Sequence, residues 1–315
     1  MITLVEVTAR VMSRESKASL PVPTLQPAAA TGATGVFRSG ADLHPRLRAQ
    51  LDALGLGRSP NPVAAMSALL PVISTQYEQI DEERRGVVRS MPGGHRLIVL
   101  DQLGYGRSDR PDGASVSVSA HGRRALEVLD ALNVPQACVV GHDLGGAVSQ
   151  WLALHAPNRV SRLALINSVG LDAWPRWRTR VARSLAAAAR LLPAPLVAGE
   201  AYAELVRGFA DRAEGRHDLD IFLRPFAQQA GRGALLAHLE AQRSHETSAM
   251  ALDTLRVPTA IIHGARDPFV PVSLSRRLQA AIPGATLDVV DGARHFTPLD
   301  APIQVAAVVG ALLGR

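Results

Sequence analysis

The chain has 315 residues, of which 47% are apolar and 20% are charged, and its formal net charge is +6. This length and composition exclude a globally disordered chain and suit one α/β domain with an insertion. Lys17 is the only lysine, and the arginines are scattered among acidic residues without a helix-turn-helix, zinc-finger or RNA-binding signature, which excludes a typical nucleic-acid-binding protein.

The single cysteine, Cys138, excludes an intramolecular disulfide and is expected to be a buried thiol. Residues 1–23 lack the apolar core of a signal peptide, and the chain has no run of about 18 apolar residues. We therefore expect a cytoplasmic protein with a small-molecule substrate and without a nucleic-acid or membrane partner. The histidines show no metal-ligand spacing, so neither a metal nor a cofactor is predicted. The oligomeric state is left open.

The N-terminal part carries the weakest pattern. Residues 2–7 fit a short strand, but a stretch rich in Pro, Ala, Thr, Ser and Gly follows, so residues 1–60 are interpreted as a poorly defined arm. Apolar spacing predicts a short helix over residues 45–56, and an apolar run predicts a strand over residues 64–74.

From residue 95 onward, buried-strand patterns alternate with helix-period segments. Strands are predicted at 96–101, 137–140, 162–166, 258–263 and 286–290. Helices are predicted from Ser117 or Ser119 to Leu132, and at 147–156, 272–282 and 303–313. The alternation indicates an α/β fold with a doubly wound, mostly parallel sheet, whose core comprises residues 61–170 and 256–315.

Residues 171–255 interrupt this alternation. Their pattern is helical and punctuated by prolines, with Trp174 and Trp177 at the entrance. Such an insertion between two strands predicts a helical cap over an active site, and the alternative is a bundle that extends the core.

The segment with the strongest functional signal is VVGHDLGG at residues 139–146. A buried strand ends at a glycine-flanked dipeptide and a helix follows at once, as in the nucleophile elbow G-x-nucleophile-x-G. The glycines are needed because a Cβ there would strike the neighbouring strand or helix. The residue at the tip is Asp143, and the alternative reading is that its carboxylate only caps the following helix.

Asp267 and His295 also follow predicted strands. Because the carboxyl ends of parallel strands line one crevice, both side chains can converge on Asp143. The chain order of nucleophile, acid and histidine is that of α/β hydrolases. The alternatives are a helix cap for Asp267, which precedes Pro268, and an ordinary loop histidine for His295.

Four motifs occur in order, at 101–109, 141–146, 264–268 and 292–296. With them, residues 95–315 resemble the α/β-hydrolase fold family. Within that family, an aspartate at position 143 is similar to the branch of epoxide hydrolases and haloalkane dehalogenases.

The resemblance implies a two-step hydrolysis. Asp143 attacks an sp³ carbon to form an alkyl–enzyme ester, and His295, oriented by Asp267, activates the water that hydrolyses this ester. The backbone N–H of Leu144 is expected to stabilise the oxyanion. Attack of Asp143 on an ordinary ester would give an anhydride, so an esterase is the least favoured reading.

Differences between this sequence and the branch of epoxide hydrolases and haloalkane dehalogenases narrow the expected class of substrate. Many members have tryptophan after the nucleophile as a halide donor, and Leu144 replaces it here, which favours an epoxide over a halide. Trp174 or Trp177 can substitute from the cap, the alternative being apolar packing. An epoxide needs an acidic hydroxyl, and Tyr202 is the only cap tyrosine, the alternative being a packing role. His142 and Phe296, next to the nucleophile and the base, are assigned to substrate binding.

The second departure concerns the oxyanion hole. The family has a His-Gly motif about 25 to 30 residues before Asp101 to supply the second donor. Counting back reaches residues 73–76, where no His-Gly occurs, so either an N–H within 74–76 substitutes for it or the oxyanion hole is incomplete. The predicted function is hydrolysis of a small, apolar epoxide or haloalkane, and the alternative is a non-hydrolytic binding or scaffold protein of this fold.

Overall fold

The computed structural model describes residues 2–7, 86–91, 96–105, 108–109, 113–172 and 177–314. Its strands are β1 (Ile2–Val7), β2 (Arg96–Asp101), β3 (Ala137–His142), β4 (Val160–Ile166), β5 (Thr259–Gly264) and β6 (Thr286–Val290). The helices that flank this sheet are α4 (Val87–Ser90), α5 (Val118–Ala131), α6 (Leu144–His155), α13 (Val272–Ala281), α14 (Thr297–Asp300) and α15 (Pro302–Leu313), with a 3₁₀ turn η2 (Pro157–Arg159).

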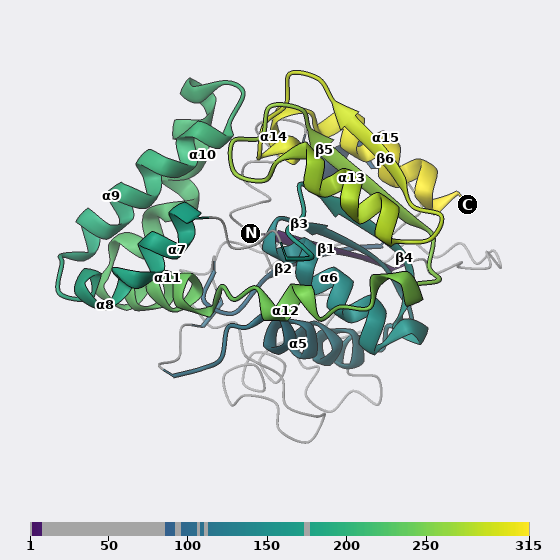
Figure 1. The fold of residues 1–315 in the computed structure, drawn as a ribbon, viewed down its shortest axis with the longest axis horizontal. Helices are drawn as coiled ribbons and strands as arrows, with labels where there is room; N and C mark the ends of the chain where they lie inside the picture. Colours follow the sequence, from purple (N-terminus) through teal and green to yellow (C-terminus); the bar gives the residue numbers. More distant parts are fainter. Residues whose placement is uncertain are drawn as a thin grey trace, which may run out of the picture.

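The six strands form one sheet in the order β2-β1-β3-β4-β5-β6 (Figure 1). Strands β3 to β6 pair in parallel, whereas β1 is antiparallel to both of its neighbours. The predicted fold class, a mostly parallel sheet with helices on both faces, is therefore confirmed. Because Ile2 pairs with Asp101 and Thr3 with Gly141, β2 and β3 end at the same edge of the sheet. That edge carries the functional residues.

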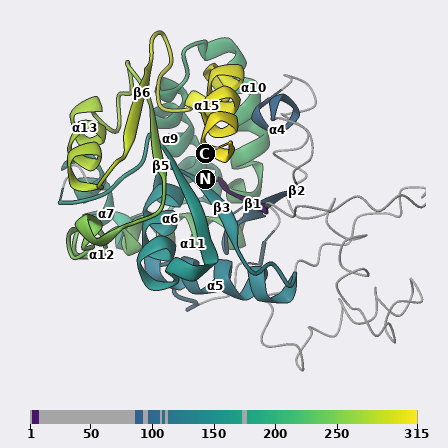
Figure 2. The ribbon, with the colours of Figure 1, turned by 90° about the vertical axis from the view of Figure 1, so that its right-hand side faces the viewer.

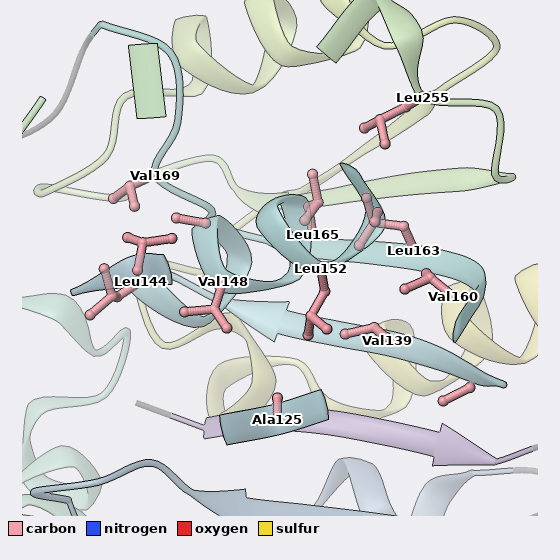
Figure 3. Packing of buried hydrophobic residues seen from close by; sticks show 14 of the residues in the cluster. Ala125, Val139, Leu144, Val148, Leu152, Val160, Leu163, Leu165, Val169 and Leu255 are labelled. Atoms are coloured by element: carbon pink, nitrogen blue, oxygen red, sulfur yellow. The ribbon is translucent and has the colours of Figure 1, made fainter. Parts of the chain in front are cut away.

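The hydrophobic core is divided between the two faces of the sheet. Val139 on β3 faces the layer of α5, α6 and α13, where it packs with Val148 and Leu152 of α6 (Figure 3). Cys138, which is buried and not disulfide-bonded as predicted, faces the opposite layer of α4 and α15. Figure 2 shows α13 and α15 on opposite sides of the sheet. This alternation with a period of two residues is what buries a parallel sheet on both faces.

Most strands and helices predicted from residue 95 onward are confirmed within a few residues at each end. The N-cap of α5 is Ser117, whose hydroxyl accepts a 3.1 Å hydrogen bond from the Ala120 N–H. The short helix α14 was not predicted, because four residues are too few to show helical periodicity. The elements predicted at 45–56 and 64–74 lie outside the described residues.

A helical region follows β4 and precedes β5 in the chain, and its helices α7 to α11 lie on the left of Figure 1. It comprises α7 (Trp177–Ser184), α8 (Ala186–Ala189), α9 (Ala194–Leu205), η3 (Val206–Gly208), α10 (Arg212–Leu223), η4 (Arg224–Ala227), α11 (Gln229–Ala241), α12 (His245–Ser248) and η5 (Leu252–Thr254). This region has a hydrophobic core of its own, built from Phe209, Leu219, Leu223 and Phe226. We refer to α7–α11 as the cap. In the described part of the chain, no helix is both long enough and apolar enough to span a bilayer.

Candidate active site

Asp143 occupies the turn between β3 and α6 in a strained backbone conformation, with φ 52° and ψ −116°. The turn is held by hydrogen bonds on both sides: its N–H donates to the Ile166 carbonyl at 3.1 Å, and its carbonyl accepts from Gly146 and Val169 at 3.0 and 3.3 Å. A non-glycine residue in such a conformation costs roughly 1–3 kcal/mol and persists where the surroundings enforce it. The fold therefore fixes this residue at the sheet edge.

The glycines beside Asp143 are required because a side chain at either position would overlap neighbouring atoms. A Cβ on Gly141 would overlap the Gly145 carbonyl and the Ser149 hydroxyl, and a Cβ on Gly146 would overlap the Ser168 hydroxyl. The Asp143 side chain makes no capping hydrogen bond to α6. The helix-cap reading of Asp143 is therefore wrong, and the carboxylate is directed to other partners.

One of these partners is His295, which lies between two carboxylates. Its Nδ1 is 2.9 Å from Asp267 Oδ2, and its Nε2 is 3.6 Å from Asp143 Oδ2. The imidazole is 4% exposed and the Asp267 side chain 1%, whereas the Asp143 side chain is 20% exposed. The structure thus brings the three predicted residues into one line, with the accessible carboxylate at its end.

Asp267 uses both carboxylate oxygens. Oδ1 accepts hydrogen bonds from the N–H groups of Phe269 and Val270 at 2.7 and 3.0 Å in the loop before α13, whose N-cap is Pro271, so Asp267 is not the helix cap considered from sequence. Oδ2 accepts from the Asn167 side-chain amide at 2.7 Å and contacts His295. Asn167 was missed at the sequence level, although a polar residue directly after a buried strand was an available signal. It fixes the carboxylate that orients the imidazole.

The two carboxylates shift the proton equilibria of the site. Burial opposes charge on His295, but the negative charges of Asp267 and Asp143 outweigh it and raise the pKa of His295 to about 10. Burial likewise opposes the ionised form of Asp267, yet the His295 charge and hydrogen bonds lower its pKa to about 2. The pKa of Asp143 is also below its ordinary value, because the His295 interaction outweighs burial. Near neutral pH the site holds two carboxylates and one imidazolium.

His142 and Phe296 lie against the base. His142 Nε2 is 2.8 Å from the His295 carbonyl, so this nitrogen carries a proton and donates it. Burial, with the His295 charge, lowers the pKa of His142 to about 4, so its ring is neutral. The Phe296 ring meets the His295 ring edge-on at 5.1 Å and stacks on Phe209 of the cap at 4.2 Å. Both residues support the loop that carries His295.

The cap contacts this loop through Gly208. Its carbonyl accepts a 3.1 Å hydrogen bond from the Phe296 N–H. A Cβ at Gly208 would lie 2.7 Å from the Phe269 ring, 2.9 Å from the Phe296 ring and 3.1 Å from the His295 Cβ. The absence of a side chain therefore allows η3 to approach the base closely.

Tyr105, in the turn after β2, is a second residue that sequence reasoning missed. Its ring lies 3.9 Å from that of His238 on α11 and 6.0 Å from that of Phe226. Burial and the charge of Asp143 raise its pKa, so its hydroxyl is within electrostatic reach of that carboxylate. The signal was its position after a strand that ends at the same edge as the elbow strand.

The remaining predicted site residues are not brought to the triad by any observed contact. The Tyr202 hydroxyl donates to the Arg216 carbonyl at 3.5 Å, within the cap. Leu144 is the first residue of α6, and its side chain is buried in the core. Trp177 begins α7, but its side chain, like Trp174 and the oxyanion segment 74–76, lies outside what the structure describes.

Comparisons with known proteins agree with this architecture. The family model described as alpha/beta hydrolase fold matches residues 77–302. RutD of Variovorax paradoxus, a proposed carbamate hydrolase, is 32% identical over 211 residues, covering 66% of this chain and 74% of that protein. A 2-hydroxymuconate semialdehyde hydrolase of Pseudomonas putida is 31% identical over 233 residues (70% and 77%). A crystal structure of an α/β-hydrolase fold protein from Burkholderia ambifaria superposes with a TM-score of 0.62, at 27% identity over 70% of this chain and 80% of that one.

Proposed function

Because this chain belongs to the α/β-hydrolase fold family and is a hydrolase of that fold, we propose that it opens small apolar epoxides through a covalent ester on Asp143. The observation that carries this proposal is the carboxylate at the elbow tip, with the His295 Nε2 3.6 Å away and Asp267 on the other ring nitrogen. A carboxylate in the nucleophile position is suited to displacement at an sp³ carbon, because the resulting ester has a carbonyl that water can attack.

In the first step, an Asp143 oxygen attacks an oxirane carbon and the carbon–oxygen bond of the ring breaks. The departing oxygen becomes an alkoxide and takes the proton of the Tyr105 hydroxyl. Burial is the larger cause of the raised pKa of Tyr105 and the charge of ionised Asp143 the smaller one, and together they keep the hydroxyl protonated at rest. Alkylation neutralises Asp143, which removes the smaller contribution and makes the hydroxyl more acidic as the alkoxide forms.

In the second step, His295 takes a proton from water and the hydroxide adds to the ester carbonyl of Asp143. At rest the pKa of His295 is raised to about 10 by both carboxylates, so the imidazole is protonated and is not a base. Once Asp143 is an ester, only Asp267 continues to stabilise the imidazolium, so the pKa of His295 falls and its proton passes to the Tyr105 phenolate, which restores the phenol and leaves a neutral imidazole as base. Alkylation of Asp143 therefore creates the ester and also generates the neutral imidazole that activates water to hydrolyse it. Cleavage of the ester releases a diol and regenerates the carboxylate.

Two side chains support an epoxide in preference to a halide. Leu144 follows the nucleophile and offers no side-chain N–H to a leaving halide, and its side chain is buried in the core. Tyr105 offers a proton, which an alkoxide leaving group needs and a halide does not. Leu144 is retained as a proposed oxyanion donor through its backbone N–H.

A second candidate is hydrolysis of an acyl compound, favoured by the relatives whose names denote a carbamate hydrolase and a semialdehyde hydrolase. In that case water activated at the Asp143 carboxylate would attack the substrate carbonyl directly, because attack by Asp143 itself would give an anhydride and His295 is protonated at rest. The two mechanisms differ in the origin of the product oxygen.

The deciding experiment is a single turnover with enzyme in excess in ¹⁸O-water. The covalent mechanism predicts a diol whose new oxygen is unlabelled, because it comes from Asp143, followed by one ¹⁸O in the peptide that contains Asp143. A labelled product in the first turnover would contradict the covalent step. His295→Gln should in addition accumulate an adduct on that peptide by intact-protein mass spectrometry, and Asp143→Asn/His295→Gln, which has no nucleophile, is the matched control.

A further inference from the structure

Large apolar side chains are exposed together at the outer end of the cap. Among the described residues, five of the seven exposed large hydrophobic side chains fall between residues 181 and 196: Val181 (51% exposed), Leu185 (58%), Leu191 (87%), Leu192 (47%) and Leu196 (60%). We call this set the cap patch. It spans the end of α7, the α8 segment and the start of α9, which lie far from the sheet in Figure 1. Contiguous exposed apolar residues commonly mark an interaction surface.

The surroundings of the cap patch are positively charged. Among the side chains that the structure describes between Asp172 and Glu200, the charged ones all belong to arginines: Arg180, Arg183 and Arg190. Arg190 is ion-paired with Glu240 at 2.6 Å. Arg183 and Arg232 donate to the backbone carbonyls of Gln242 and Leu192, and neither guanidinium forms an ion pair with a carboxylate of the described residues. Arg180 is exposed.

This combination argues against a second copy of the chain as the partner. A two-fold contact places the same patch on both sides of the interface. Arg180 of one copy would then approach the arginines of the other, and such like-charge contacts oppose association. A partner that is apolar and carries negative charge satisfies both features of the cap patch.

We propose that the cap patch docks on the surface of a lipid bilayer that contains anionic headgroups. Leucines at α8 and α9 would enter the interface, and arginines would meet the headgroups, as in helices that lie on a membrane without crossing it. The sequence-based expectation of no membrane partner considered only spanning segments. This inference goes beyond the proposed reaction and does not depend on it.

The test is vesicle flotation of the full chain with phosphatidylcholine vesicles, alone or with phosphatidylglycerol. We expect binding to the anionic vesicles, weakened by salt. Leu191→Ser/Leu192→Ser should lower the binding constant about tenfold, and Arg180→Gln about fivefold. The matched controls are Ile303→Ser, which removes an apolar side chain that is 70% exposed on α15, and Arg123→Gln, which removes an exposed arginine of α5. Both should bind as the wild type does.

Three results would overturn the proposal. The first is no flotation of the wild-type chain with anionic vesicles at low salt. The second is equal flotation with vesicles of phosphatidylcholine alone. The third is a dimer in sedimentation velocity that the double serine variant abolishes, without vesicle binding, which would identify the patch as a contact between copies. The substituted side chains are exposed, so circular dichroism melts should match the wild type and exclude misfolding.

Discussion

The side-chain amide of Asn167 donates to the same oxygen, Oδ2 of Asp267, that holds the ring of His295. A second bond from this amide, 3.1 Å to the Arg294 carbonyl, ties the end of β4 to the loop that carries the base. Asn167 therefore holds in place both the Asp267 carboxylate and the chain segment next to His295.

Asn167→Gly should slow hydrolysis of the alkyl–enzyme about tenfold, the effect of losing a hydrogen bond to a charged group, and leave alkylation unchanged. Glycine accommodates the φ of 43° at this position. Asn133→Gly is the matched control, because Asn133 has a φ of 49° and is exposed. Stopped-flow measurement of the two steps separates them. Equal slowing of both steps would contradict a role through Asp267.

Tyr105→Phe should slow alkylation by an epoxide about 100-fold, because the alkoxide then leaves without a proton donor. Alkylation by an alkyl bromide should be unchanged, since bromide leaves unprotonated. Tyr202→Phe serves as the control, because its hydroxyl contacts a backbone carbonyl within the cap. Rapid quench with mass spectrometry of the adduct measures both rates. If Tyr202→Phe is the slower variant, the acid lies in the cap instead.

His295 gives the folded state a pH-dependent stability. Its pKa is raised from 6.5 to about 10, so its contribution is complete below pH 6.5 and is lost as the pH rises through about 10. Between pH 7 and 9 the stability difference between wild type and His295→Gln should shrink by up to about 1.4 kcal/mol per pH unit. Urea denaturation at these pH values measures it. A difference that stays constant would mean that the imidazole is neutral at rest.

Gly146→Ala should destabilise the chain by about 1–3 kcal/mol, because the new methyl group overlaps the Ser168 hydroxyl. Gly199→Ala is the control: within α9 a Cβ meets nothing within 4 Å, so this change should stabilise by about 0.5–1 kcal/mol. Thermal unfolding followed by circular dichroism compares them. Similar melting temperatures for both variants would show that the elbow tolerates a side chain.

The parallel half of the fold was predictable because its signals are local. Strands such as Thr259–Gly264 and Val160–Ile166 are short, mostly apolar runs with turn signals at their ends, and their observed bounds lie within two residues of the prediction. The position of Ile2–Val7 between β2 and β3 was not predictable, since pairing partners are set by tertiary contacts and not by the strand's own pattern.

The residues of the site likewise include some that the sequence predicts and some that it does not. Asp143, Asp267 and His295 were found because each follows a strand in a recognisable turn. Asn167 and Tyr105 lack such a motif, and their importance depends on distances across the sheet edge that only the folded chain defines.

The hydrogen bond from the Phe296 N–H to the Gly208 carbonyl joins the cap to the loop that carries His295. Any outward swing of η3 must either break this bond or draw the segment bearing His295 away from the elbow. The positions of the cap and of the base are thus coupled: while this bond holds, the chain at Gly208 cannot shift without moving the segment that bears His295.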